Sequence, residues 1–547
     1  MRALVMRFLL PFLAVAFCSC STQSTRGPAS SIEWFRGSLE AALSEAQSEG
    51  RHIFLYWGAT WCDACQDIEA SILKRRDVAA ELRSFIPLRV TNDSGMASRI
   101  QEELHLSDGT YPVLVVLNAD RAEIARLPHT MERHIYAGVL ADAAASVTPV
   151  RSLLNSLMET EVGSTNEPTY ALPNSDATIP RSKSGTSSPL SHSSCRRIAY
   201  NHWAADPLMT PNEEAMLRLS KAAALAANLC PHALATERAR LISLAVKMRS
   251  AMESRAVKRG SPTSATMTEL LDQISEFLTD PAFARSIADS LAVLSPNFFS
   301  VARARGSQFG EQLLQRWVAT MDLAATYPRY SPGTRVSFLA SELTAAEGLH
   351  PERSIPMSLW SSAISRAEAI LRETHDQYAR AFVISGVVGL YQKLGRPEQA
   401  RAVVESEMSN SPSPSMYMNA LMYFDEQLGR TAAALEWARR SYEEAEGSMT
   451  RFRRGVTYLS RLMKASDTSP EVIESTVLSL IGEIRGSNDL YGDTGARMAI
   501  LGSLVLAWSK AAQREHFAYT AQARLNEICG SAAATLAPCS AFSPTSN

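Results

Sequence analysis

The feature that most constrains the fold is a pair of cysteines, Cys62 and Cys65, placed between two different hydrophobic patterns. The apolar run His52–Trp57 (HIFLYW) ends just before the pair and predicts a buried strand. A helical pattern over Asp63–Arg83 begins at the pair itself. The two thiols are therefore expected in the first turn of a helix that follows a strand, where their spacing allows a disulfide across one turn.

The start of a helix has consequences for thiol chemistry. Free backbone N–H groups and the helix dipole stabilise negative charge there, which favours the thiolate of Cys62. Because the thiolate is the form that attacks a disulfide, we predict that Cys62 is the exposed catalytic nucleophile. Cys65 is then the second catalytic thiol, which resolves the mixed disulfide. Asp63 disfavours the thiolate electrostatically, which indicates a reductase or interchange type rather than a strong oxidant.

The cysteine pair has two other interpretations, a metal site and a structural disulfide. A structural zinc ion needs about four Cys or His ligands, whereas His52 and His105 are isolated and His129 and His134 share one segment. We therefore predict no metal and no cofactor. A passive structural disulfide remains the other alternative.

Strand and helix patterns alternate between residues 32 and 150. Further apolar runs predict strands near residues 85–90, 112–117 and 122–127, and helical patterns occupy residues 38–48, 97–104 and 131–145. The turn residues Asn118 and Asp120 suit a hairpin between the last two strands. This order predicts an α/β layer with a mixed sheet over residues 32–150.

The rest of the chain changes character twice. Residues 161–194 consist largely of Ser, Thr, Pro, Gly and Asn, so we expect a flexible linker at residues 151–195. Amphipathic helical patterns then dominate residues 196–547, for example at 213–228, 237–254, 358–373 and 496–508. A Leu-Gly pair at Gly395 recurs 34 residues later at Gly429, and a small residue at Ala400 recurs at Ala434. Glycine permits a tight turn between helices, and alanine permits close helix contact.

The N-terminal part resembles a thioredoxin fold, closest to the C-terminal thioredoxin-like domain of the thiol:disulfide interchange protein DsbD. The resemblance rests on the strand that leads into Trp-Cys-x-x-Cys, the helix continuing through residues 66–69, the residues 91–93 and the sequence Tyr111-Pro112-Val113. It implies a thiol–disulfide oxidoreductase in which Pro112 forms a cis peptide bond beside the cysteines. It also implies that Trp61, Tyr111 and Pro112 bind substrate.

Three positions compare less simply with that family. Glu69 matches an acidic position and is implied as a residue that modulates the thiol pKa, the alternative being a solvated surface residue. Tyr56 stands where family members commonly carry a buried aspartate. Tyr111 replaces the Thr or Ile that often precedes the cis-proline, so substrate preference follows less directly from the resemblance.

The 34-residue period resembles the tetratricopeptide repeat, which implies recognition of a protein partner on a concave surface. We accordingly expect an α-helical, repeat-like domain that recruits a protein substrate to the cysteine pair. The alternative is an irregular helical bundle in which the two similar segments arose by chance.

The N-terminus suggests export. Arg2 and Arg7 precede the ten-residue apolar run Phe8–Phe17, which is too short to span a membrane. With the following cysteines it resembles a bacterial lipoprotein signal, which implies a signal peptide at residues 1–19, lipidation at Cys20 and a tether at 20–31. An ordinary signal peptide and an uncleaved anchor remain alternatives. All three place the chain outside the cytoplasm, facing the periplasm and, with the lipid, anchored to a membrane.

Four cysteines remain: Cys195, Cys230, Cys529 and Cys539. An even number in an oxidising compartment suggests two structural disulfides, and four cysteines permit three pairings. Proximity favours Cys529 with Cys539 and Cys195 with Cys230. The alternative is that Cys195 exchanges disulfides with Cys62.

The sequence as a whole predicts an exported thiol–disulfide oxidoreductase supplied with electrons by an upstream thiol donor. The alternative is a non-enzymatic adaptor lipoprotein that uses both parts for binding. A nucleic-acid partner is not expected, because 54 Lys and Arg residues against 56 Asp and Glu residues give a net charge of −2.

Overall fold

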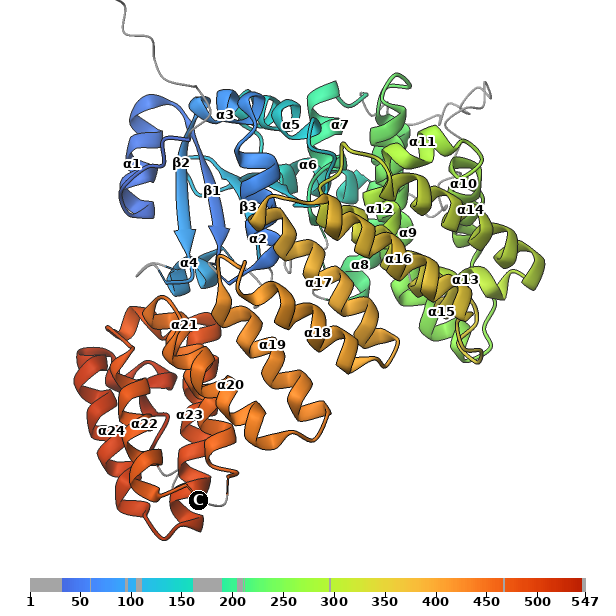
Figure 1. The fold of residues 1–547 in the computed structure, drawn as a ribbon. Coiled ribbons are helices and arrows are strands. Elements are labelled where there is room, and N and C mark those ends of the chain that lie inside the picture. Colours follow the sequence, from blue (N-terminus) through green and yellow to red (C-terminus); the bar gives the residue numbers. More distant parts are fainter. Residues whose placement is uncertain are drawn as a thin grey trace, which may run out of the picture.

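The computed structural model describes residues 32–59, 61–93, 97–104, 111–160, 189–203, 210, 212–294, 297–465 and 468–543. An N-terminal α/β part is followed by a long helical region (Figure 1). The predicted signal peptide at residues 1–19, the lipidated Cys20 and the tether at 20–31 lie outside the described residues, as does His105.

The α/β part is built on one four-stranded sheet. Its strands are β1 (His52–Gly58), β2 (Phe85–Thr91), β3 (Val113–Leu117) and β4 (Glu123–Leu127). Their order in the sheet is β2-β1-β3-β4, with β1 parallel to β2 and antiparallel to β3, and β3 antiparallel to β4. The prediction of an α/β layer with a mixed sheet is confirmed.

Helices cover both faces of this sheet. They are α1 (Leu39–Glu49), α2 (Asp63–Ile68), α3 (Arg76–Glu81), α4 (Ala97–Glu103) and α5 (Ile135–Ala144). Side chains of a strand alternate between faces, and β1 follows this rule: Ile53, Leu55 and Trp57 pack with α1 and α4. Phe54 and Tyr56 pack with α2, α3 and α5. β1 is therefore buried on both faces of the sheet. Helix α2 begins shortly after the end of this buried strand.

The helix predicted over residues 63–83 is interrupted. After α2 the chain makes a π-helical turn at Glu69–Leu73 and then starts α3 at Arg76. Ile72 and Val78 are both buried in the same core, although a continuous helix would place residues six apart on different faces. The break lets both side chains reach the sheet.

The helical region contains eighteen of the described helices with these bounds, besides α6 (Val150–Thr160) that leads toward it: α7 (His192–Ala199), α8 (Glu213–Leu229), α9 (Ala235–Lys258), α10 (Ala265–Phe277), α11 (Pro281–Ser286), α12 (Ala288–Ala292), α13 (Asn297–Ala304), α14 (Ser307–Ala325), α15 (Pro332–Leu349), α16 (Met357–Glu373), α17 (Gln377–Lys393), α18 (Pro397–Met408), α19 (Pro414–Gln427), α20 (Thr431–Glu443), α21 (Ser448–Leu462), α22 (Pro470–Gly482), α23 (Gly492–Ala511) and α24 (Glu515–Cys529). None of the helices in the described ranges is both long and apolar enough to cross a membrane.

The linker predicted at residues 151–195 is too wide at both ends. Helix α6 occupies residues 150–160, and its Val150 and Leu154 are buried in the core of the helical region. Helix α7 begins at His192 and buries Cys195 in the same core. Apolar residues at helical spacing order these segments because their burial offsets the cost of fixing the chain. Residues 161–188 lie outside the described part.

The two segments that share the 34-residue period, around Gly395 and Gly429, are each a pair of helices joined by a turn. Helices α17 and α18 form the first pair, and α19 and α20 form the second. Gly395 and Gly429 sit in the connecting turns, each with φ +72°, a conformation that favours glycine. Ala400 and Ala434 are buried. The turn and the close contact that the small residues predict are both present.

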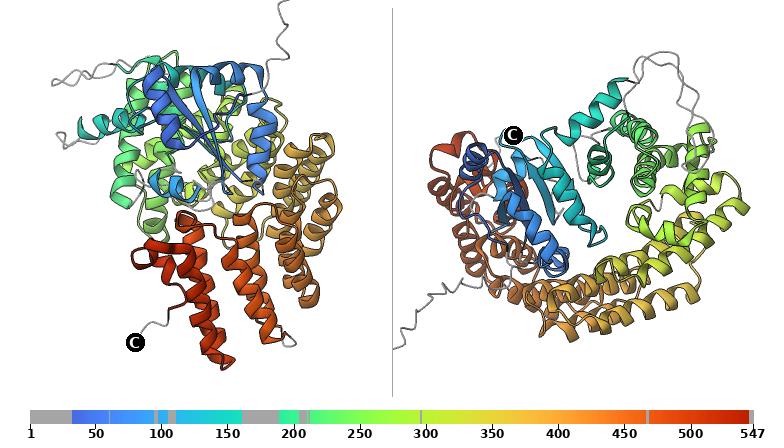
Figure 2. Two further views of the ribbon diagram at one scale, coloured as in Figure 1. Left: turned by 90° about the vertical axis from the view of Figure 1, so that its left-hand side faces the viewer. Right: turned by 90° about the horizontal axis from the view of Figure 1, so that it is seen from above.

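The helical region curves around the α/β part when seen from above (Figure 2). Helix α17 packs against α2, and α23 contacts α4. These contacts place the helical region against the edge of the sheet where β1 ends and the cysteine pair begins.

Candidate active site

The cysteine pair lies at the junction of β1 and α2. Cys62 is the N-cap residue of α2, and its Sγ accepts a hydrogen bond from the backbone N–H of Cys65 at 3.0 Å. Cys62 and Cys65 form a disulfide. Cys62 is 5% exposed and Cys65 is 1% exposed. The sulfur of Cys62 thus occupies the helix N-terminus that the spacing predicts, but it is much less exposed than expected.

Two aromatic side chains border the pair. The Tyr111–Pro112 peptide bond is cis, as the resemblance implies. The Tyr111 ring lies 5.3 Å from the Trp61 ring, measured between ring centroids. Both rings pack against the cluster that contains Cys62 and Cys65. The structure therefore brings Trp61, Tyr111 and Pro112 together at the site.

The helical region forms the opposite wall of the site. A groove of about 450 Å³ runs between the two parts. The α/β part contributes Trp61, Cys62, Asp63 and Tyr111, and helices α17, α19 and α21 contribute Ser385, Val388, Gln392, Met416, Asn419, Ala420, Tyr423, Phe424, Gln427 and Arg454. In addition, Phe382 of α17 packs directly against the cysteine cluster. This wall explains the low exposure of Cys62, and the groove is the opening onto which Cys62 faces.

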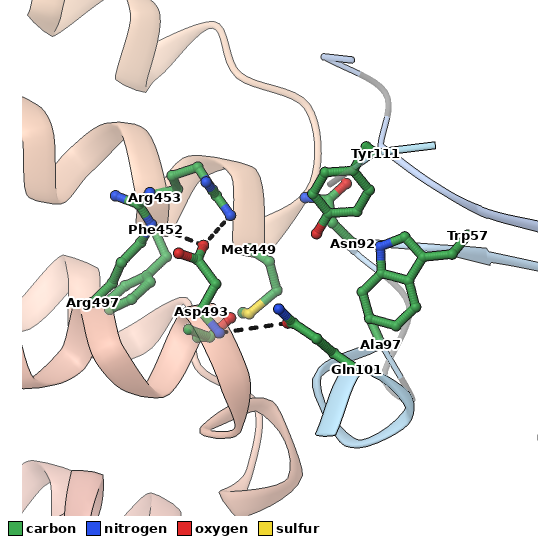
Figure 3. Close-up of a pocket in the computed structure, with 11 residues that line it drawn as sticks. Trp57, Asn92, Ala97, Gln101, Tyr111, Met449, Phe452, Arg453, Asp493 and Arg497 are labelled. Carbon is green, nitrogen blue, oxygen red and sulfur yellow. Dashed lines mark hydrogen bonds and ion pairs between the residues drawn. The ribbon is translucent and has the colours of Figure 1, made fainter. Parts of the chain in front are cut away.

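Helix α21 brings two arginines to the site. The guanidinium carbons of Arg453 and Arg454 lie 4.9 and 5.9 Å from the centre of the Trp61 ring. Arg453 pairs with Asp493, which also binds Arg497, in a small adjoining pocket (Figure 3). Burial, and then the charges of Arg453 and Arg497, lower the pKa of Arg454 to about 10. Arg454 nevertheless stays cationic at neutral pH.

The α/β part itself holds α21 in place. The Asp93 carboxylate accepts hydrogen bonds from the backbone N–H of Thr450 at 3.0 Å and from its hydroxyl at 2.8 Å. Asp93 thereby supplies the cap that the N-cap residue of α21, Gly447, cannot provide. A Cβ on Gly447 would collide with that carboxylate, and the φ of +86° at Gly447 also favours glycine.

A family model described as thioredoxin-like matches residues 33–119. The match includes β1, the cysteine pair, the cis-proline and β3. No curated protein and no solved structure matches the chain significantly. The chain thus has an N-terminal thioredoxin-like domain followed by an all-helical region, and the Cys62–Cys65 pair in that domain supports a thiol–disulfide oxidoreductase.

Glu69 binds side chains of the sheet in the thioredoxin-like domain. The Tyr56 hydroxyl donates a hydrogen bond to Glu69 Oε1 at 2.8 Å, and Arg89 pairs with the same oxygen at 2.6 Å. Burial, and then the charge of Glu69, raises the pKa of Tyr56 well above its ordinary value. Tyr56, at the position where the resemblance implies a buried aspartate, is therefore a neutral phenol. The effect of Glu69 on the Cys62 thiolate stays a prediction.

A buried carboxyl group in α2, that of Asp67, was not predicted from the sequence. Asp67 is 2% exposed, and its oxygens accept hydrogen bonds from Ser331, the N-cap residue of α15, and from Ser71. Burial raises the pKa of Asp67 to about 6, partly offset by these hydrogen bonds. Its partner Ser331 is 264 residues away in the chain, so the local pattern gave no sign of this contact.

Asp67→Asn should change how stability depends on pH. Because folding raises this pKa from 3.8 to about 6, the wild type loses unfolding free energy as the pH rises from 4 to 6. The loss is about 3 kcal/mol and persists above pH 6. Asparagine keeps an acceptor oxygen without the charge, so the variant should be more stable at pH 8 and equally stable at pH 4. Urea unfolding at both pH values checks this, and parallel pH profiles for the two proteins would contradict it.

The other four cysteines among the described residues form two disulfides elsewhere in the structure. Cys195 pairs with Cys230, and Cys529 pairs with Cys539, which are the pairings that proximity favours. Cys195 is completely buried in the helical core, so the alternative in which it exchanges with Cys62 lacks an accessible sulfur. Among the described residues, no three His, Cys, Asp or Glu side chains are grouped to hold a metal ion.

Proposed function

We propose that the chain is an exported thiol–disulfide oxidoreductase, of the reductase or interchange type, that acts on disulfides of polypeptides entering the groove. One observation carries this proposal. The sulfur of Cys62 sits at the N-terminus of α2, accepts the N–H of Cys65, and faces an open groove. This position stabilises a thiolate and gives a substrate access to it.

The roles of the two thiols follow from their places: Cys62 is the N-cap residue of α2 and lines the groove, whereas Cys65 lies within the helix and does not line it. In the reduced protein, the Cys62 thiolate attacks one sulfur of the substrate disulfide and forms a mixed disulfide, while the other substrate sulfur leaves as a thiolate and takes up a proton. Cys65, the more buried thiol, then loses its proton and attacks the Cys62 sulfur. The second substrate thiol leaves, and two electrons have passed from the pair to the substrate. A dithiol donor returns the electrons to the pair.

The helical region is proposed to recruit the polypeptide substrate. Its helices α17, α19 and α21 form one wall of the groove that reaches Cys62. The two glycine-linked helix pairs support an interpretation as tetratricopeptide-like repeats, which commonly present concave binding surfaces.

Export and lipid anchoring at Cys20 are part of the same proposal. The basic and apolar N-terminal sequence supports them. The disulfides Cys195–Cys230 and Cys529–Cys539 also suit an oxidising compartment outside the cytoplasm.

A second candidate is a non-enzymatic adaptor. The 5% exposure of Cys62 favours it, because a flat protein surface could not reach this sulfur. Under this alternative, both parts of the chain only bind a partner.

Insulin reduction by the purified full chain separates the two candidates. With dithiothreitol as the dithiol donor, the enzyme should accelerate precipitation of the insulin B chain well above the rate with dithiothreitol alone. A rate equal to that with dithiothreitol alone would reject the oxidoreductase and favour the non-enzymatic adaptor.

A further inference from the structure

Arg454 is an unpaired charge in the wall of the groove. It makes no ion pair or hydrogen bond within the described part of the chain, and its Nε is buried without a hydrogen-bond partner. Its contact is the Trp61 ring, whose own Nε1 is also buried and unpartnered. A buried donor without an acceptor is costly, most of all a charged one. Two buried donors without an acceptor, Trp61 Nε1 and Arg454 Nε, therefore belong to residues that line the groove beside Cys62.

The other arginines of α21 show that this is unusual. Arg451 pairs with Glu483 at 2.9 Å, Arg453 pairs with Asp493, and Arg461 pairs with Glu426 at 2.8 Å. Each carboxylate belongs to another segment of the helical region. Arg454 differs from them because it points its charge toward the groove rather than toward an acidic residue of the protein.

The groove has little negative charge of its own to offer this guanidinium. The carboxylate among its lining residues is that of Asp63. Its Oδ1 accepts the N–H of Ala64 at 2.7 Å, so it is already stabilised by the start of α2. The remaining lining from α17 and α19 is neutral, with amides such as Gln392 and apolar side chains such as Phe424. The volume of about 450 Å³ is in the range that holds a ligand of several linked groups.

We propose that Arg454 selects polypeptide disulfides in which an aspartate or glutamate stands next to the attacked cysteine. The acidic side chain pairs with Arg454 while the neighbouring sulfur faces Cys62, and the adjoining substrate residues lie along the apolar wall. A planar guanidinium binds a carboxylate through two parallel hydrogen bonds, which fixes orientation as well as charge. This inference rests on the proposed function and makes Arg454 a specificity-determining residue.

The test compares two peptides that contain the same disulfide and differ only in Glu or Gln beside the attacked cysteine. Each reacts with prereduced full-length protein in a single turnover, followed by thiol labelling and mass spectrometry. The wild type should reduce the Glu peptide about tenfold faster, the effect of one good charged hydrogen bond. Arg454→Gln should abolish this ratio, and Arg454→Lys should retain part of it. Circular dichroism melts establish that the variants are folded.

Arg439→Gln is the matched control. Arg439 is an exposed arginine of α20 that pairs with Glu436 and Glu443 and does not line the groove. The variant removes the same charge and should keep the wild-type ratio of the two peptide rates. If Arg439→Gln also abolishes the difference between the two peptide rates, the inference is overturned, because the net charge of the protein would then explain the difference.

The other outcomes separate this inference from the proposed function. If the wild type reduces both peptides at one rate, the inference is overturned and the oxidoreductase stands. If neither peptide is reduced, the proposed function itself fails. If Arg454→Gln slows both peptides and neutral bis(2-hydroxyethyl) disulfide by one factor, Arg454 acts on the thiolate and not on the substrate, which overturns selection. If glutathione disulfide reacts as fast as the Glu peptide, the inference that the groove selects polypeptide disulfides is overturned.

Discussion

Serine in place of Cys62 is expected to lower disulfide reduction more than about 10³-fold, as loss of a covalent nucleophile does in other enzymes. A hydroxyl group at the start of α2 does not ionise near neutral pH and cannot form the mixed disulfide. Cys65 cannot replace it, because Cys65 is only 1% exposed and, unlike Cys62, does not line the groove. The insulin assay measures the effect directly.

Cys65→Ser provides the comparison for this result. This variant keeps the attacking thiolate, so it should accumulate a mixed disulfide with its substrate and fail at turnover. Isolation of such adducts from cells would identify both the client and the electron donor. The double variant Cys529→Ser/Cys539→Ser is the control, since that disulfide joins α24 to the segment after it and neither cysteine lines the groove, and it should keep its activity. Undiminished activity of Cys62→Ser would refute the mechanism.

Asp289→Ala is expected to destabilise the protein by about 3–5 kcal/mol, the usual cost of stranding one partner of a buried ion pair. Arg240 donates to both Asp289 oxygens, at 2.7 and 2.8 Å, and the two side chains are only 5% and 2% exposed. The Arg240 guanidinium also stacks on Tyr200, 4.2 Å from the ring centre. Tyr200 belongs to the core of the thioredoxin-like domain, so the loss extends to the junction of the two parts.

Replacing both members of the pair tests this explanation. Arg240→Met/Asp289→Leu removes both charges together, so it should recover much of the stability that Asp289→Ala loses. Denaturant midpoints of the wild type, the single variant and the double variant give the comparison. A cost below about 1 kcal/mol for the single variant would show that the pair is not buried in solution.

The thioredoxin-like domain could be predicted from sequence because its signals are local. The strand β1 and the start of α2 follow from hydrophobic periods that lie within single segments. The break after α2 could not be foreseen, because it depends on Ile72 and Val78 reaching one core. The ends of the linker were predicted wrongly for a related reason: Val150, Leu154 and Cys195 are buried in a core formed with segments far along the chain.

The candidate site likewise contains some residues that a local motif predicts and others that only the fold brings there. Its cysteines and the cis-proline follow from a short motif, but the opposite wall comes from segments far along the chain. Arg454 looks like any surface arginine in sequence, and only the fold shows that no carboxylate among the described residues pairs with it. Likewise, Asp93 and Thr450 are 357 residues apart, so their capping contact leaves no local pattern.

The position of Cys62 beneath α19 and α21 has a steric consequence for clients. A rigid globule with a disulfide on a flat surface would collide with these helices before its sulfur came within bonding distance. A loop, a chain end or an unfolded stretch can enter the groove that Cys62 lines. Shape would thus restrict the chemistry to flexible or not yet folded chains, ahead of any recognition of individual side chains.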